Sequence, residues 1–278
     1  MSELIVRRLL IDLETPVARH WLGGDAFKTA LFNALSMSFP FGEQFFIDSV
    51  RKGIKALPEA EQQTRSAETQ GFIGQEATHR RIHSLFNVQI EKHGLVNYWE
   101  PRARERLKHI ADLNPRHWLA ITAATEHITA IFADWMLSHP ELLDGSEDRL
   151  KTMWLWHSAE ESEHKCTAFD LYMALGGSSD WRITWFNRIT MVFLTDLLRQ
   201  TVNNLHHDGT LWQWQTWRSG LGFVFGKAGL FRTLHRPWSV YKRSDFHPMQ
   251  LHSDLSSNWL HNNRASYVAA GVANVASA

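Results

Sequence analysis

Residues 157–164 read His-Ser-Ala-Glu-Glu-Ser-Glu-His, and this stretch decides how the rest of the chain is interpreted. At 100° per residue, the side chains of His157, Glu161 and His164 lie within an arc of roughly 60° on a helix. Glu160 lies at the border of that arc. Side chains three and four positions apart stand above one another on a helix face and can reach a shared point. The stretch therefore predicts a helix that presents one carboxylate and two imidazoles on one face.

An earlier segment carries the same kind of pattern. Residues 76–79 read Glu-Ala-Thr-His, and His83 follows four positions later. Glu76, His79 and His83 again fall within an arc of roughly 60° on a helix. We expect Glu76 and His79 to be metal ligands. His83 is either a residue that orients a ligand through a hydrogen bond or a core histidine with its own partner.

Two further acids stand alone in segments with helical periodicity. Glu43 shares a helix face with Phe46 and other apolar residues, so its carboxylate is expected to point inward. Glu126 shares a face with Ala123 and Ala130, whose small side chains would leave room beside it. An ionised carboxylate in an apolar interior costs several kcal/mol unless it is paired or bound to a metal. A lone acid in a helix is more often a salt-bridge partner. Glu43 and Glu126 therefore indicate a metal site only when they are considered together with the paired motifs.

Together, the four segments match the ligand set of a carboxylate-bridged two-metal site in a helix bundle. Such sites take one Glu from each of two helices and a Glu-x-x-His motif from each of the other two. A single Glu-x-x-His is usually a solvated helix face, but the joint pattern is far more specific. The predicted metal ligands are Glu43, Glu76, His79, Glu126, His157, Glu161 and His164. Glu160 is the candidate general base.

The chain is expected to be all-α and to form a single domain over residues 1–278. Hydrophobic periodicity and capping residues predict helices over 25–57, 58–92, 102–112, 115–137, 146–176 and 180–207. Residues 25–177 would form the metal-binding core, and 178–270 would be a helical and irregular extension that packs on it. Pro40 is expected to interrupt the first helix. Residues 236–248 are expected to be extended, and no strand is predicted.

Composition excludes several classes of function. Lys+Arg and Asp+Glu are both 29, so nothing indicates a nucleic-acid partner. No stretch is long and apolar enough to predict a membrane-spanning segment. The first residues lack the layout of a signal peptide, and the single cysteine, Cys166, fits a reducing compartment. We therefore expect a cytoplasmic protein, with Cys166 packed in the interior and not bound to metal.

The motifs resemble those of a known superfamily. The order Glu43, Glu76-x-x-His79, Glu126, Glu161-x-x-His164 is similar to the ferritin-like di-iron carboxylate proteins. The additional His157 resembles the p-aminobenzoate N-oxygenase branch, whose di-iron site has three histidines. The resemblance implies a ferritin-like four-helix bundle with additional C-terminal helices.

A second resemblance covers more of the chain. Four stretches of the chain are similar to a bacterial family labelled as predicted metal-dependent hydrolases. They are Phe39-Pro-Phe-Gly-Glu43, Gln75-Glu-Ala-Thr-His79, Trp156-His-Ser-Ala-Glu-Glu-Ser-Glu-His-Lys165 and Phe246-His-Pro248. This similarity spans about residues 39–248.

Three functions remain open at this point. The ligand order favours an O2-activating oxygenase or oxidase that holds two iron ions and uses an electron donor to oxidise a small-molecule substrate. The alternative is a two-metal hydrolase, with manganese or zinc as further candidate ions. A non-enzymatic metal-binding bundle is the third. The amphipathic helix near residues 181–205 is expected to pack on the bundle, with a homodimer interface or a peripheral membrane contact as its alternatives.

Overall fold

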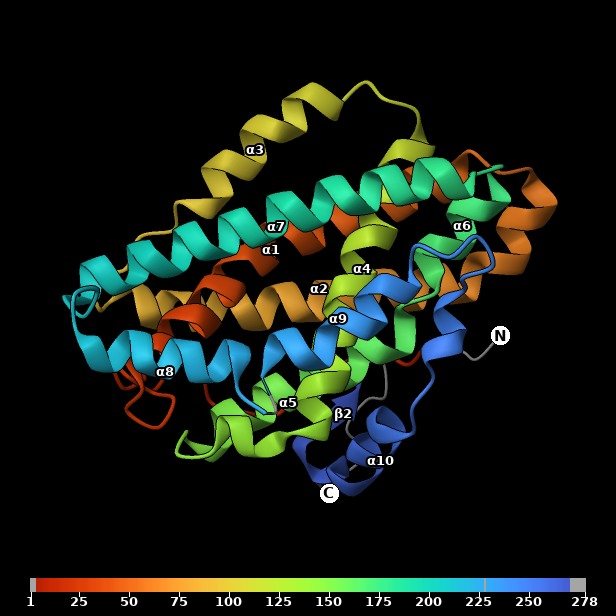
Figure 1. Cartoon of the computed structure of the whole chain (residues 1–278). Coiled ribbons are helices and arrows are strands. Elements are labelled where there is room, and N and C mark those ends of the chain that lie inside the picture. The colour runs from red at the N-terminus through yellow and green to blue at the C-terminus, as the bar shows by residue number, and fades with distance from the viewer. Residues whose placement is uncertain (1–3, 228, 271–278) are drawn as a thin grey trace, which may run out of the picture.

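The computed structural model describes residues 4–227 and 229–270, which form an all-α fold (Figure 1). The long helices are α1 (Ala26–Lys55), α2 (Glu59–Glu91), α4 (Pro115–Ser138), α5 (Asp148–His164) and α7 (Ser179–Asp208). The shorter ones are α3 (Trp99–Ile110), α6 (Thr167–Ala174), α8 (Trp214–Phe225), α9 (Leu230–Val240) and α10 (Leu255–Asn262). Short 3₁₀ turns are η1 (Pro140–Leu143), η2 (Pro248–Leu251) and η3 (Arg264–Ser266). The all-α prediction is confirmed.

Two helix pairs make up the centre of the fold. α1 packs along α2, α4 packs along α5, and α1 also contacts α4 (Figure 1). The helix starts follow the expected signals. The Asp25 side chain accepts a hydrogen bond from the Lys28 amide, and Asn114 caps α4 just before Pro115. Pro40 lies inside α1 and does not end it, so the carboxylate of Glu43 is presented by a continuous helix.

The predicted helix over 146–176 is two helices. α5 ends at His164, a turn follows at residues 165–166, and α6 begins at Thr167. Neither glycine nor proline marks this break, and the helical periodicity continues through it, so the sequence predicted one helix. Cys166 lies at the turn, and burial raises the pKa of its thiol to about 12, as expected for a packed cysteine and not a reactive one.

The C-terminal helices cover one face of the two pairs. α7 runs alongside α1 and α4, whereas α8 contacts α1 and α9 contacts α4 (Figure 1). The expectation of an extended segment over 236–248 is wrong for its first part, because α9 continues through Pro237 to Val240. A proline lacks only its own N–H, and Trp238 anchors this turn by donating from Nε1 to Thr190 at 3.1 Å.

Two short strands, which the sequence did not predict, join distant parts of the chain. β1 (Arg7–Leu9) pairs antiparallel with β2 (Tyr267–Ala269), with Arg7 opposite Ala269. Three residues are too few for the alternation that identifies a strand in a sequence. The segment that leads into β1 packs on α2, where a Cβ on Gly74 would clash with Val6 Cγ2. Glycine at this position therefore permits the close approach that puts Arg7 beside α5.

Aromatic side chains fill much of the core. Trp154 packs edge-on against Phe32 with ring centroids 4.9 Å apart, and Trp21 stacks parallel to Trp154. Such pairs add to the free energy gained by burying the rings. Much of the high tryptophan content therefore has a packing role. Within the described residues, none of the helices combines the length and apolar character needed to cross a membrane.

Candidate metal centre

All the predicted metal ligands meet in the interior between α1, α2, α4 and α5. Each is at most 4% exposed. α1 presents one of them, α2 two, α4 one and α5 three. They are Glu43, Glu76, His79, Glu126, His157, Glu161 and His164. The structure thus brings together side chains that are up to 121 positions apart in the chain, between Glu43 and His164.

Two groups within this cluster have the spacing of metal ligands. Glu76, His79, Glu161 and His164 each offer one ligand atom, and these atoms lie within 4.8 Å of one another. Glu43, His79 and His157 form a second group by the same criterion. Imidazole nitrogens and carboxylate oxygens are the donors that iron, manganese and zinc accept in proteins. The cluster therefore has the donors and the spacing for two adjacent cations.

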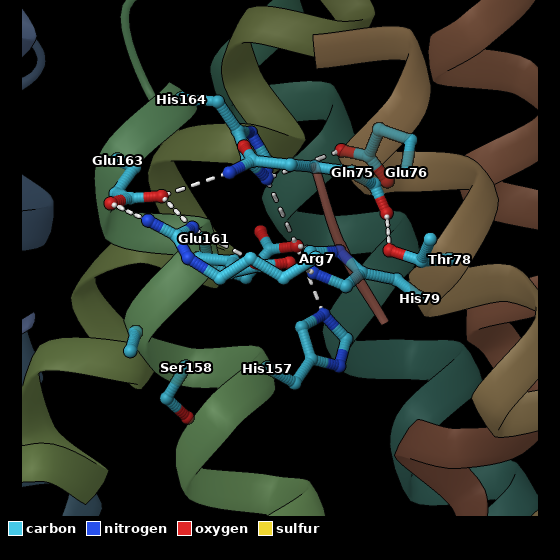
Figure 2. A network of polar contacts seen from close by, with 12 residues as sticks. Arg7, Gln75, Glu76, Thr78, His79, His157, Ser158, Glu161, Glu163 and His164 are labelled. Carbon is cyan, nitrogen blue, oxygen red and sulfur yellow. Dashed lines mark hydrogen bonds and ion pairs between the residues drawn. The ribbon is translucent and has the colours of Figure 1, made fainter. Parts of the chain in front are cut away.

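Glu161 lies at the middle of the cluster (Figure 2). Its Oε1 is 2.9 Å from Nε2 of His157, 3.3 Å from Nδ1 of His79 and 3.7 Å from Nε2 of His164. These imidazoles come from both α2 and α5. Glu161 thus lies next to imidazoles from both groups with ligand spacing.

Many ligand atoms in the cluster are buried without a hydrogen-bond partner. Both carboxylate oxygens of Glu43 and both of Glu76 are in this state. One ligand atom is unpartnered in each of four further residues: Nδ1 of His79, Oε1 of Glu126, Oε2 of Glu161 and Nε2 of His164. Buried polar atoms in native proteins are nearly always paired. The unpartnered atoms are those that bound cations would engage, so the donor set fits a pair of metal ions.

Glu160 contacts the ring nitrogen of His79 that faces away from the centre. Its Oε2 is 3.0 Å from Nε2 of His79, whereas Nδ1 of the same ring faces Glu161. Carboxylates placed in this way hold a metal-binding histidine in one orientation and make it more basic. Glu160 and Glu161 thus contact opposite ring nitrogens of His79.

Arg7 is a functional candidate that the sequence motifs did not reveal. Its guanidinium donates to Glu160 at 2.9 Å. It also donates to both oxygens of Glu163, at 2.7 and 3.0 Å (Figure 2). Gln75 also donates to Glu163, at 2.8 Å. Arg7 thus completes a chain of contacts from β1 through Glu160 to His79. Neither a motif nor a periodicity in the sequence connects Arg7 with acids more than 150 positions away.

His83 contacts the ring nitrogen of His157 that faces away from Glu161, just as Glu160 contacts the corresponding ring nitrogen of His79. Nε2 of His83 is 2.6 Å from Nδ1 of His157, which leaves Nε2 of His157 facing Glu161. The Ser36 hydroxyl is 2.9 Å from Nδ1 of His83 and donates to Asn87. His83 is therefore both fully buried and hydrogen-bonded to a predicted ligand.

Aromatic rings pack edge-on against three imidazoles of the cluster. His79 contacts Trp156 with ring centroids 5.1 Å apart, His157 contacts Phe39 at 4.8 Å, and His164 contacts Phe72 at 4.9 Å. These rings restrict the tilt of each imidazole and keep water away from it. The three imidazoles are thus packed against aromatic carbon.

Burial and mutual repulsion dominate the acid–base behaviour of the carboxylates. Burial raises the pKa of Glu43 and of Glu76 well above its ordinary value. Burial also acts on Glu161, but the charge of His164, the hydrogen bond from His157 and the nearby imidazole of His79 outweigh it and hold the pKa of Glu161 well below its ordinary value. The metal-free centre therefore keeps protons on some acids, and cations that bind there would displace them.

The pKa of His79 leads to a testable pH dependence. Burial lowers this pKa, but the hydrogen bond to Glu160 and the negative charges of Glu160 and Glu161 outweigh burial and raise it from 6.5 to about 10. The folded metal-free protein then keeps a proton that the unfolded chain releases. The stabilisation is complete below pH 6.5 and is lost as the pH rises toward 10.

We expect the free energy of unfolding of the metal-free protein to fall between pH 6.5 and about 8.5, below the range in which ordinary lysines titrate. The proton on His79 contributes a slope of at most ~1.4 kcal/mol per pH unit, and protons kept by Glu43 and Glu76 act in the same direction. Urea unfolding at several pH values measures it. The metal-loaded protein is the control and should show a flatter profile, because a metal-bound imidazole carries no such proton. A metal-free profile that is level or rises with pH would contradict this assignment.

A cavity leads from the cluster toward the surface. It has a volume of about 570 Å³ and is lined at its inner end by His157, Ser158 and Glu161. Helices α1, α4, α7 and α9 supply most of its walls, and most of the lining side chains are apolar. The cavity gives a small molecule access to Glu161, the residue at the middle of the cluster.

Comparison with known proteins gives one family. The model of a family described as predicted metal-dependent hydrolase matches residues 5–252. This match covers all the predicted metal ligands as well as Arg7, Glu160 and the walls of the cavity. Neither the curated proteins nor the solved structures give a significant match to the chain.

Proposed function

The chain belongs to the family described as predicted metal-dependent hydrolases, and we propose that it is a two-metal enzyme whose centre is the buried cluster between α1, α2, α4 and α5. The observation that carries the proposal is the set of buried carboxylate and imidazole atoms without hydrogen-bond partners. Removing charged groups from water costs several kcal/mol per ion, and divalent cations in the cluster would offset that cost. The two groups with ligand spacing provide a place for each ion.

We assign the ligands by their neighbours. Glu76 and His164, whose Oε1 and Nε2 atoms are 3.7 Å apart, would hold one cation, and Glu43 and His157 would hold the other. Glu161 would bridge the two, since its carboxylate lies between the imidazoles of both groups. This arrangement supports membership of the ferritin-like di-iron superfamily, with His157 as the third histidine.

Two ligands complete the set. Glu126 would join the first cation through Oε1, which has no partner and belongs to a carboxylate whose charge acts on Glu76, while its Oε2 is 3.1 Å from Nδ1 of His164. His79 has spacing compatible with either position, and the contact between its Nε2 and Glu160 leaves Nδ1 as its donor atom. We propose that Glu160 positions His79, in place of the general-base role that its sequence position suggested.

Hydrolysis is the reaction that the family description favours. Two bound cations would act as Lewis acids that activate water and polarise the bond to be cleaved. The carboxylates of the cluster would balance the charge of the cations. Glu160 and His83 would orient the ligand imidazoles, and the apolar cavity would confine the substrate. The substrate would enter through that cavity, because it is lined by Glu161 and His157.

Oxidation with O2 is the second candidate, and one observation favours it. The cluster combines one Glu from each of two helices with Glu-x-x-His from α2 and from α5, which is the ligand set of carboxylate-bridged di-iron bundles. An apolar cavity beside the centre would suit an oxidation from which water is excluded. Two iron ions and an external electron donor would be required.

Metal loading separates the two reactions. Metal-free protein is loaded anaerobically with ferrous iron, or with zinc or manganese, and the bound metal is measured after gel filtration. We expect about two ions per chain. Release of nitrophenol from nitrophenyl esters by the zinc or manganese form would support hydrolysis. O2 uptake by the ferrous form with an added reductant, without ester cleavage by any form, would support oxidation. If none of the three metals is retained, the two-metal proposal is wrong.

A further inference from the structure

The cavity beside the metal centre is elongated. Its lining follows α1 from Phe27 to Phe39 and α7 from Thr190 to Thr201. At 1.5 Å per residue, these stretches correspond to ~18 Å and ~17 Å of helix. The volume of about 570 Å³ lies within the ~300–1,000 Å³ of typical small-molecule sites. The space is therefore much larger than water or O2 requires, and it is long in one direction.

The walls between the centre and the surface offer almost no free polar group. The hydroxyls of Thr129 and Thr201 donate to the backbone oxygens of Glu126 and Leu197. Ser158 likewise donates to the backbone oxygen of Trp154, at 2.8 Å. The hydroxyl of Thr190 accepts from Trp238. A ligand in this space therefore contacts hydrocarbon along most of its length and meets charge at Glu161.

The outer end of the cavity is apolar as well. Leu194, Leu198 and Phe231 line it and are 54%, 60% and 62% exposed. Single exposed apolar side chains are common on proteins. Here they come from α7 and α9 and surround one opening, which is how entrances for apolar ligands are built. His235, which stacks on Phe231, is an imidazole at this end.

We propose that the cavity holds the unbranched hydrocarbon chain of an amphiphilic substrate. The reacting polar group lies beside Glu161 and His157, and the chain extends between α1, α4 and α7 toward Leu194 and Phe231. This inference rests on the two-metal function proposed above and names the substrate class of that centre. The shape and the lack of polar partners carry it, since a compact polar substrate would leave most of the space unfilled and would lose its own hydrogen bonds.

Chain-length dependence of binding tests the proposal without any turnover. Hexan-1-ol, octan-1-ol and decan-1-ol are titrated into metal-free and zinc-loaded protein by calorimetry. Each buried methylene is expected to tighten binding by up to about fourfold, so decan-1-ol should bind far more tightly than hexan-1-ol. The dependence should be present in both forms, because the walls and not the cations contact the chain. Equal affinity for all three alcohols would overturn the proposal.

A pair of variants on α7 tests the location. Leu194 lines the outer end, whereas Met191 is 67% exposed and does not line the cavity. Leu194→Arg is expected to weaken decan-1-ol binding about tenfold by placing a charge in an apolar opening, and Met191→Arg should change it by less than about twofold. Equal effects of the two substitutions would contradict entry at this opening.

The arginine of Leu194→Arg could turn toward solvent and leave the cavity open, so a third variant tests the interior of the cavity directly. Ala133 on α4 is buried and lines the cavity, so Ala133→Leu removes space inside it. Decan-1-ol binding should weaken more than hexan-1-ol binding, because only the longer chain needs the lost volume. Identical affinities to the unmodified protein for both alcohols would overturn the proposal. Failure of the two-metal function would appear separately, as loss of metal retention with chain binding intact.

Discussion

Replacing Glu161 by glutamine is expected to abolish retention of the metal pair. The substitution keeps the size of the side chain but removes the charge that faces the imidazoles of His79, His157 and His164. Loss of a residue that only supports a ligand already lowers metal affinity about 10–100-fold. Loss of the residue between two cations should cost more than about 100-fold for at least one of them. Activity should fall to background.

The matched control for this variant is Glu163→Gln on the same helix. It also removes one carboxylate, but Glu163 contacts Arg7 and Gln75 and no imidazole of the cluster. We expect this variant to retain about two ions per chain, as measured by metal analysis after gel filtration. Circular dichroism checks that both variants keep their helices. If Glu161→Gln retained both ions, or if the two variants lost them equally, the central role of Glu161 would be refuted.

Replacing Arg7 by methionine is expected to cost about 3–5 kcal/mol of unfolding free energy. The guanidinium is buried and bonds Glu160 and Glu163 from a strand far away in the sequence. Its removal leaves the fully buried carboxylate of Glu160 with the His79 imidazole as its remaining charged partner and takes the guanidinium from Glu163. Methionine fills a similar volume, so the loss of unfolding free energy measures the missing charge and hydrogen bonds and not the effect of a cavity. Urea unfolding of the metal-free protein measures the difference.

Arg8, the next residue in β1, provides the control. It is exposed, so Arg8→Met should change the unfolding free energy by less than about 0.5 kcal/mol. Arg7→Lys should lie between the two, because one ammonium group cannot reproduce the forked contacts of a guanidinium. Arg7→Met should also weaken metal binding, since Glu160 would hold His79 less firmly. A loss no larger than that of Arg8→Met would exclude this stabilising role.

The sequence predicted the parts of the centre that follow from helix periodicity. His157, Glu161 and His164 fall on one face because spacings of three and four residues bring side chains together on any α-helix. The main helices followed from apolar patterns and caps such as Asn114-Pro115. Such signals are local in the chain, so a single sequence contains them.

The features that the sequence did not predict depend on distant contacts. Arg7 gains its role from Glu160, which lies 153 positions further along. The turn that separates α5 from α6 has no breaker residue, and α9 passes through a proline that normally discourages a helix. The apolar cavity combines side chains from helices across the whole chain. Tertiary packing decides each of these, and no local pattern encodes it.

The strand that carries Arg7, which contacts Glu160 behind His79, can pair with β2 only late in synthesis. Arg7 leaves the ribosome early, yet its strand partner at residues 267–269 is synthesised only after every helix that surrounds the ligands. Contacts between such distant residues form slowly, because a long loop must close first. The nascent chain can therefore assemble the helices that carry the predicted ligands before Arg7 is fixed by its strand partner, and we infer that His79 is less firmly held until then.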